Sequence, residues 1–231
     1  GKAFYDEKSR QIMNSIYGKG VKDPDKIGEG IYNLYGVGKE GFDIVSNQFS
    51  IHYFFENFDT LLGFVQNVSE NCKKNGYFIG TCYDGKKIFK LLKNIKIDSS
   101  LVKKDDDKIS WSIKKKYNKN EIQNDKRCLG YKIDVFQESI NQSISEYLVN
   151  FDYFTELLEN FGFVPCPAKD LQKMHFKNPV GSFEELFNEM EENIKLNRIK
   201  KHYIGDALNM TNNEKEISFL NNYFIYKKIR N

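Results

Sequence analysis

Residues 41–56 read GFDIVSNQFSIHYFFE and decide how the rest of the chain is interpreted. Phe42, Ile44 and Val45 predict a buried strand, and the residues that follow it, 46–53, are polar and aromatic at once. In α/β sheets, ligands bind outside the carboxyl ends of the strands. We therefore expect a ligand site where this strand ends.

The next segments complete a βαβ unit. Apolar residues recur at helical spacing over residues 61–72, and Asn75-Gly76 is typical of a helix C-terminus. Residues 77–83, YFIGTCY, predict a second buried strand, and a further helix follows over 85–92. A strand, a helix of this length and a second strand predict a parallel pair joined by a right-handed crossover.

The composition predicts a folded domain without a metal centre. Hydrophobic residues make up 40% of the chain, which is enough for a packed core, and a net charge of +3 demands no nucleic-acid partner. The four cysteines form no CxxC pair, so neither a zinc site nor a disulfide framework is expected. No apolar run approaches the ~20 residues of a membrane span, and no signal peptide opens the chain. We expect a cytoplasmic protein with no membrane contact.

The first 41 residues are rich in glycine. Ile12, Met13 and Ile16 have the spacing of a short amphipathic helix. No strand precedes the GKG, GEG and GVG motifs of residues 18–41, as a phosphate-binding loop would require. We interpret this part as an irregular surface segment.

The second half of the chain alternates strands and helices. Residues 93–128 are charged and poorly periodic, and within them only the alternation of Ile109, Trp111 and Ile113 predicts a strand. Residues 129–149 predict two antiparallel strands. A helix is expected over 150–162 and a short strand after it. A second helix is expected over 182–201, with a capping box at its start, and an aromatic strand over 216–228.

Several of these segments resemble mRNA cap (guanine-N7) methyltransferases, most closely those of large DNA viruses. The resemblance rests on QFxxHYxFE at 48–56, on NGYFIGT at 75–81, and on GYKIDV and EYLVNF at 130–135 and 146–151, which are similar to the family's lid hairpin. It implies an α/β fold: a partial Rossmann-like methyltransferase sheet with helices on both faces and an inserted antiparallel lid hairpin. It also implies S-adenosyl-L-methionine (SAM) as methyl donor and the capped 5′ end of mRNA as partner.

The resemblance starts at residue 42 and lacks the family's first SAM-binding motif. In the family, a DxGxGxG-type loop follows the first strand, and residues 1–231 contain none. We expect the C-terminal portion of one methyltransferase domain, inactive alone, whose partners are the missing N-terminal half and, by resemblance, triphosphatase and guanylyltransferase domains. Its parts would be a lead-in (1–41), a βαβ core (42–92), lid strands (109–149) and the remaining core (150–231).

The implied reaction needs positioning rather than a general base. Guanine N7 is a neutral nitrogen with a free lone pair, and orientation of the two substrates can lower the barrier by ~7–11 kcal/mol. No catalytic residue is therefore assigned, and no metal is expected.

The residues expected to bind the cap guanine are aromatic or acidic. Phe49, His52 and Tyr53 offer surface for base stacking, which contributes about 1–3 kcal/mol. By resemblance, Glu146 accepts hydrogen bonds from the guanine N1–H and amino edge, while Gln48 and Tyr53 lie against SAM. Taken alone, these residues would be interpreted as core aromatics, a structural histidine and a surface charge.

A tyrosine near the final strand also packs on the cap in the family. Our alignment places Asn221 at that position, and Tyr223, on the same strand face, is the expected replacement. Cys82 and Tyr83 follow the second strand and could line the site.

Two other functions are compatible with the sequence. A small-molecule SAM methyltransferase of this fold would lack the lid hairpin and Glu146 as a base reader. A catalytically degenerate, stimulatory subunit of a capping complex would have lost SAM binding. Such a subunit has no need to keep Gln48, His52, Tyr53 and Glu146 together.

Overall fold

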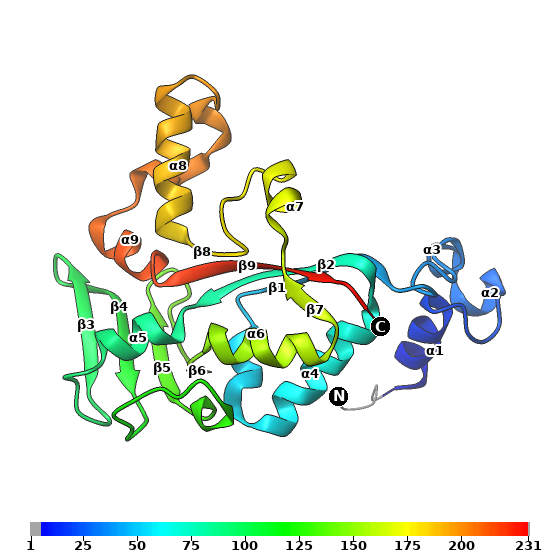
Figure 1. Cartoon of the computed structure of the whole chain (residues 1–231), viewed down its shortest axis with the longest axis horizontal. Helices are drawn as coiled ribbons and strands as arrows, with labels where there is room; N and C mark the ends of the chain where they lie inside the picture. Colours follow the sequence, from blue (N-terminus) through cyan, green and yellow to red (C-terminus); the bar gives the residue numbers. More distant parts are fainter. Residues whose placement is uncertain (1–5, 231) are drawn as a thin grey trace.

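The computed structural model describes residues 6–230, and residues 1–5 and 231 lie outside the described part. It contains a five-stranded mixed sheet and a separate four-stranded antiparallel sheet. Figure 1 shows the two sheets side by side, with a small helical lobe at the end of the molecule opposite the second sheet. The fold is therefore mixed α/β, as predicted.

The five-stranded sheet has the order β1-β2-β9-β7, and β8 also pairs with β9. β1 (Phe42–Gln48) and β2 (Cys72–Tyr83) are parallel, which confirms the predicted βαβ unit. β9 (Asn221–Lys228) runs antiparallel to β2 and also to β7 (Phe163–Pro165) and β8 (Val180–Ser182).

Helices cover both faces of this sheet, as expected. α4 (Phe58–Asn71) and α6 (Phe151–Asn160) lie on one face, where Val65, Phe154 and Leu158 pack against Phe78 and Tyr226. α7 (Ala168–Lys173) and α8 (Phe183–Lys195) lie on the other, over Tyr223 and Ile225. Alternation along β9 sends successive side chains to opposite faces, so its aromatic run fills both layers.

The expected lid hairpin is larger than predicted. It is a four-stranded sheet of β3 (Ser100–Asp105), β4 (Lys108–Lys115), β5 (Lys132–Gln137) and β6 (Gln142–Tyr147). β3 was not expected, because its lysines and aspartate mask a weak alternation in which only Leu101 is an inward-facing apolar residue. The buried face of the sheet packs on α5 (Gly85–Leu91) and α9 (Asn212–Ser218).

β1 is an edge strand, not the buried strand expected from its apolar residues. Among residues 6–230 it pairs only with β2, and Ile44 is 58% exposed. Asp43, Ser46 and Gln48 are exposed as well. A run of apolar residues predicts that a strand is buried, but it does not identify the element that buries it.

Three element boundaries differ from the predictions. α4 ends at Asn71 rather than Asn75, because β2 already starts at Cys72. The capping box predicted between Ser182 and Glu185 at the start of α8 is present, but the helix ends at Lys195 rather than at residue 201. Residues 212–218 form α9 instead of the start of the final strand, since Thr211 and Glu214 make a second capping box.

The glycine-rich lead-in is more regular than expected. The predicted amphipathic helix is α1 (Glu7–Ile16), and two short helices, α2 (Pro24–Ile27) and α3 (Glu29–Asn33), follow it in the segment interpreted as irregular. Within residues 6–230, no helix is both long enough and apolar enough to cross a lipid bilayer.

Candidate functional site

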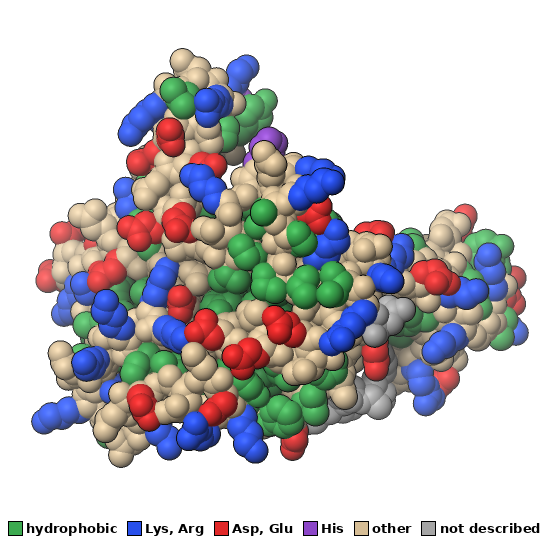
Figure 2. All heavy atoms as spheres, viewed as in Figure 1, with side chains coloured by type: hydrophobic (Ala, Val, Ile, Leu, Met, Phe, Trp, Pro, Cys, Tyr) green, Lys and Arg blue, Asp and Glu red, His purple; other side chains and the backbone are tan. Residues whose placement is uncertain are grey.

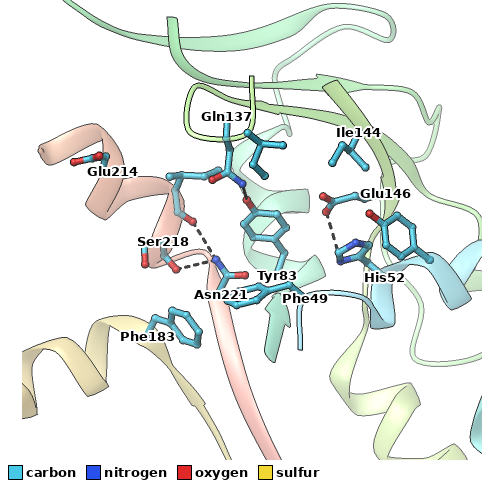
Figure 3. Close-up of a pocket in the computed structure, with 13 residues that line it drawn as sticks. Phe49, His52, Tyr83, Gln137, Ile144, Glu146, Phe183, Glu214, Ser218 and Asn221 are labelled. Atoms are coloured by element: carbon cyan, nitrogen blue, oxygen red, sulfur yellow. Dashed lines mark hydrogen bonds and ion pairs between the residues drawn. The ribbon is translucent and has the colours of Figure 1, made fainter. Parts of the chain in front are cut away.

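A cavity of about 430 Å³ lies where the carboxyl ends of β1 and β2 meet the lid sheet and α9. Figure 3 shows its side chains converging from these elements. It is walled by aromatic and aliphatic side chains with a few polar groups among them: Phe49, His52, Tyr53, Tyr83, Gln137, Ile140, Ile144, Glu146, Phe183, Glu214, Ile217, Ser218 and Asn221.

His52 and Glu146 form the polar centre of the cavity. His52 lies on a 3-10 turn (Ile51–Glu56) directly after β1, and Glu146 lies on β6 opposite Ile133. They are 94 positions apart in the sequence, yet His52 Nδ1 is 3.6 Å from Glu146 Oε2. Both side chains are buried, at 4% and 7% exposure. The fold therefore brings together two of the predicted guanine-binding residues.

Neither group is satisfied by the described part of the chain. Both ring nitrogens of His52 and Oε2 of Glu146 are buried without a hydrogen-bond partner among residues 6–230. A buried polar atom left unpaired costs about 1–3 kcal/mol, more if it is charged. In a folded protein such groups call for an explanation, and an incoming ligand with matching donors and acceptors supplies one.

Burial opposes charge on both groups. It raises the pKa of Glu146 from 4.5 to about 7 and lowers the pKa of His52 from 6.5 to about 4. His52 is therefore neutral near pH 7, so its contact with Glu146 is not an ion pair under these conditions. At 3.6 Å the two atoms are also too far apart for a good hydrogen bond.

Aromatic rings form the walls of the cavity. Tyr53 packs edge-on against His52 with ring centroids 4.3 Å apart. Burial and the nearby Glu146 carboxylate raise the pKa of the Tyr53 hydroxyl, which stays protonated at neutral pH. Phe49 is 54% exposed and lies edge-on to Phe183, with centroids 6.0 Å apart. An exposed phenylalanine at a cavity mouth offers a ring face for stacking.

Phe49 also has a strained backbone. Its φ is +50°, in the left-handed region that bulky residues rarely adopt, while its N–H donates to the Thr81 carbonyl oxygen at 2.9 Å. Strain of this kind costs on the order of 1–3 kcal/mol and clusters at functional sites. Here it turns the chain sharply after β1 and places the ring at the cavity mouth.

The polar groups on the far wall are held by the chain itself. Tyr83 accepts a hydrogen bond from Gln137 at 2.8 Å, which ties β2 to the lid. Asn221 donates to the Ile217 and Ser218 carbonyl oxygens, and its Oδ1 has no partner among the described residues. Cys82 and Tyr83 are the last two residues of β2: Tyr83 lines the cavity, whereas Cys82 is buried in the core on the α4–α6 face of the sheet.

Two predicted site residues face a second cavity instead. It measures about 360 Å³, lies on the α7–α8 face of the sheet, and is lined by Gln48 and Tyr223 together with Ile44, Ile79 and Phe176. The Gln48 amide nitrogen donates a hydrogen bond to Ser46 Oγ at 2.9 Å, and its amide oxygen accepts one from Thr81 Oγ1 at 2.8 Å. Phe183 lines both cavities and lies between them.

The geometry does not support a guanine contact by Tyr223. Its ring packs on Phe176, with centroids 5.0 Å apart, and closely against Gly181, so it belongs to the α7–α8 layer. Asn221, the aligned residue, is the one that reaches the Glu146 cavity. Alternation predicts the shared face correctly, but two residues along a strand span almost 7 Å, which is enough to change cavities.

Sequence reasoning missed Gln137 and Phe183. Gln137 is the last residue of β5 and Phe183 the first of α8, and neither is part of a motif. The signal that could have identified them is their position at the end of a strand and at the start of a helix, since loops at element ends often carry binding residues. Among residues 6–230, no three His, Cys, Asp or Glu side chains are grouped so as to hold a metal ion.

The cavity thus suits a flat ring that stacks on aromatic walls and presents donors to a carboxylate. The mRNA (guanine-N(7))-methyltransferase domain family matches residues 2–229. The chain belongs to this family. The match covers both cavities and the lid, and it extends over the lead-in, which the motif resemblance from residue 42 onward did not reach.

Similar proteins include viral and fungal enzymes. A probable mRNA-capping enzyme of Acanthamoeba polyphaga mimivirus is 28% identical over 215 residues, which is 86% of this chain and 18% of that protein. An mRNA cap guanine-N(7) methyltransferase of Aspergillus oryzae is 25% identical over 218 residues, 83% of this chain and 41% of that protein. The chain therefore spans well under half the length of these relatives.

Among solved structures, the CcbJ methyltransferase from Streptomyces caelestis matches 89% of this chain and 70% of its own, with 11% identity and a TM-score of 0.44.

Proposed function

We propose that the Glu146 cavity binds the guanine of an mRNA cap, and that this chain forms the guanine side of a cap guanine-N7 methyltransferase. The observation that carries the proposal is the buried carboxylate of Glu146, which lines a cavity walled by aromatic rings and has an oxygen, Oε2, with no hydrogen-bond partner among the described residues. A structural carboxylate would have partners within the chain. A small-molecule methyltransferase or a degenerate subunit would have no need to retain it.

Guanine matches the groups that the cavity leaves unpaired. Its N1–H and amino group both donate, and an ionised Glu146 can accept from both. Neutral His52 carries one N–H, and the guanine O6 next to N1 is an acceptor for it. The base edge would thereby satisfy atoms on both His52 and Glu146. Adenine presents an amino group where guanine has O6, so it would leave the histidine donor unpaired.

The chemistry follows from this placement. When bound, SAM supplies a methyl group on a sulfonium sulfur, and guanine N7 displaces that sulfur without loss of a proton. The ring becomes positive as the N7–carbon bond forms. An ionised Glu146 at the opposite edge stabilises that charge in a water-poor cavity. Phe49 and Tyr53 hold the plane of the ring and thereby fix the direction of the N7 lone pair.

We place the methyl donor on the Gln48 side of Phe49. Gln48 lines the apolar cavity, whereas Tyr53, the other residue expected against SAM, lines the Glu146 cavity. The donor side is incomplete in this chain: β1 has a free edge among the described residues, and Ile44 is exposed beside an apolar cavity. We propose that the first half of the methyltransferase sheet packs on this edge and carries the remaining SAM contacts.

The larger protein is proposed to be a capping enzyme of the type found in large DNA viruses. The likeness to the mimivirus protein supports this, because that protein is named a probable mRNA-capping enzyme and is several times longer than this chain. Triphosphatase and guanylyltransferase domains would then precede the methyltransferase domain, and the host cytoplasm or the virion would be its site of action.

The proposal is tested by the Glu146→Gln variant. Hydrogen bonds to a charged group contribute about 1.5–3 kcal/mol, so we expect the Kd for a GpppA dinucleotide to rise roughly tenfold or more. Isothermal titration calorimetry measures this. Glu138→Gln is the matched control, because Glu138 is an exposed carboxylate on the lid outside the cavity. Equal GpppA affinities in all three proteins would refute the role of Glu146.

A further inference from the structure

Residues 183–218 form an arm that starts and ends at the rim of the Glu146 cavity. α8 begins at Phe183, which lines the cavity, and the chain returns through α9, where Glu214, Ile217 and Ser218 line it again. Figure 1 shows α8 projecting away from both sheets. With 13 residues, α8 is ~20 Å long, so the tip of the arm stands about that far from the rim.

The tip of the arm, residues 193–205, is basic, although Glu192 and Asp206 border it. It carries Lys195, Arg198, Lys200 and Lys201 and no Asp or Glu, in a chain whose net charge is only +3. All four side chains are exposed, and none forms an ion pair with another described residue. Figure 2 shows Lys and Arg side chains at this end of the molecule.

Large apolar side chains are exposed between these cations. Tyr203 is 77% exposed, Leu196 51% and Ile199 38%. The Tyr203 ring lies beside His202 with centroids 4.2 Å apart. Surfaces that bind single-stranded nucleic acid combine cations along the backbone with aromatic rings on which bases stack. The tip has both features within one short segment.

We propose that the tip of the arm binds the RNA chain downstream of the cap. The inference rests on the proposed function, because a cap in the cavity makes the RNA leave at the rim from which the arm rises. At ~3.4 Å per stacked nucleotide, the ~20 Å length of α8 corresponds to about six nucleotides. Phosphates would contact the four cations, and an unstacked base would lie on Tyr203.

The test compares two ligands: a GpppA dinucleotide, which cannot reach the tip, and a GpppA-capped RNA of about ten nucleotides, which can. We expect the longer RNA to bind wild-type protein roughly tenfold tighter at low salt. Four phosphate contacts on a single strand predict a slope of about −3 for log K against log salt concentration, a dependence that the dinucleotide would largely lack.

The decisive variant replaces the four cations of the tip by glutamine: Lys195→Gln, Arg198→Gln, Lys200→Gln and Lys201→Gln. Because these side chains are exposed, the fold should be unaffected. The matched control removes four exposed lysines from the α1–α3 lobe and so makes the same change in net charge: Lys8→Gln, Lys19→Gln, Lys22→Gln and Lys26→Gln. We expect the length-dependent gain to vanish in the tip variant and to persist in the control.

Tyr203→Ala separates stacking from charge, and we expect it to weaken the longer RNA about fivefold while leaving GpppA unchanged. A tip variant that keeps the full gain would overturn the inference, and so would a tip that binds an acidic polypeptide but not RNA. Failure of the proposed function looks different: GpppA would then bind no better than ApppA, whatever the RNA length.

Discussion

At the scale of single residues, the Glu146 cavity contains two buried polar side chains that lower the stability of the fold. His52 and Glu146 are buried with unpaired atoms, and burial opposes charge on both. A carboxyl group that serves only the fold would be paired or replaced by an apolar side chain. These two groups instead keep their hydrogen-bonding capacity free, which is the arrangement that a ligand needs.

This cost gives Glu146 a pH-dependent effect on stability. Its pKa is about 7 in the folded chain and near 4.5 in the unfolded chain. Between these values the folded state binds the extra proton, so this group lowers the free energy of unfolding as pH rises from 4.5 to 7. Above pH 7 the full penalty applies, roughly 3 kcal/mol at most.

We therefore expect Glu146→Gln to be more stable than wild type at pH 8, and to lose that advantage near pH 5. Urea denaturation at the two pH values measures the difference. His52 acts in the opposite direction. Its pKa is about 4 in the folded chain and 6.5 in the unfolded chain, so it lowers the free energy of unfolding as pH falls from 6.5 to 4. This effect is the same in wild type and in the variant. A variant less stable than wild type at pH 8 would show that the Glu146 carboxylate is paired after all.

The sequence located part of this site and missed the rest for a physical reason. Phe49, His52 and Tyr53 lie within one motif, and Glu146 was placed by resemblance to a family. Phe183 and Gln137 come from separate element ends that only tertiary folding joins. Tyr223 was placed by strand alternation, which fixes a face but not the position along it.

At the scale of elements, Gly80 of β2 occupies a position in the main sheet that has no room for a side chain. A Cβ there would lie 2.1 Å from the Asn47 carbonyl oxygen and 2.3 Å from the Phe224 ring. Gly80 thus lets β1 pack tightly on β2 and lets an aromatic ring of β9 cross above it. The position of the cavity depends on this contact, because Phe49 follows β1 directly.

We expect Gly80→Ala to lower the free energy of unfolding by about 3 kcal/mol, since a well-packed core resists an added methyl group. Gly30→Ala is the control: this glycine lies in α3 with open space around it, and alanine should raise stability by about 0.5–1 kcal/mol. Denaturant unfolding of both variants and of wild type measures these changes in the free energy of unfolding. A Gly80→Ala protein as stable as wild type would mean that β1 and β2 are less tightly packed than described.

Elements were predictable where local pattern and tertiary contact agree. The βαβ unit, α6 and the capped start of α8 follow from periodicity and capping residues. β3 and α9 did not, because β3 is an amphipathic strand rich in lysine and α9 interrupts an aromatic run that alone predicts a strand. Exposure of β1 could not be read from its sequence, since apolar residues indicate burial without naming the partner.

At the scale of the whole molecule, the two proposed substrate sides differ in how much of each lies within the described residues. The proposed guanine side is lined by residues that directly follow β1 and by residues of β2, the lid and α9, all within this chain. The proposed donor side has Gln48, an apolar cavity and a strand edge with no partner among the described residues. Such an edge readily accepts another strand.

We therefore expect residues 1–231 to show no saturable SAM binding in the micromolar range by calorimetry. GpppA binding by the same sample would serve as the control that the protein is folded. Micromolar SAM binding by this chain alone would show that the donor site is misplaced, and that the contacts assigned to the first half of the sheet lie within these residues.

The central claim, that the cavity reads a cap guanine, is tested most directly by titrating wild-type residues 1–231 with GpppA and with ApppA under the same conditions. Loss of the paired donors at Glu146 predicts that ApppA binds at least about tenfold more weakly, in line with a charged hydrogen bond of 1.5–3 kcal/mol. Equal affinity for the two dinucleotides would contradict the account.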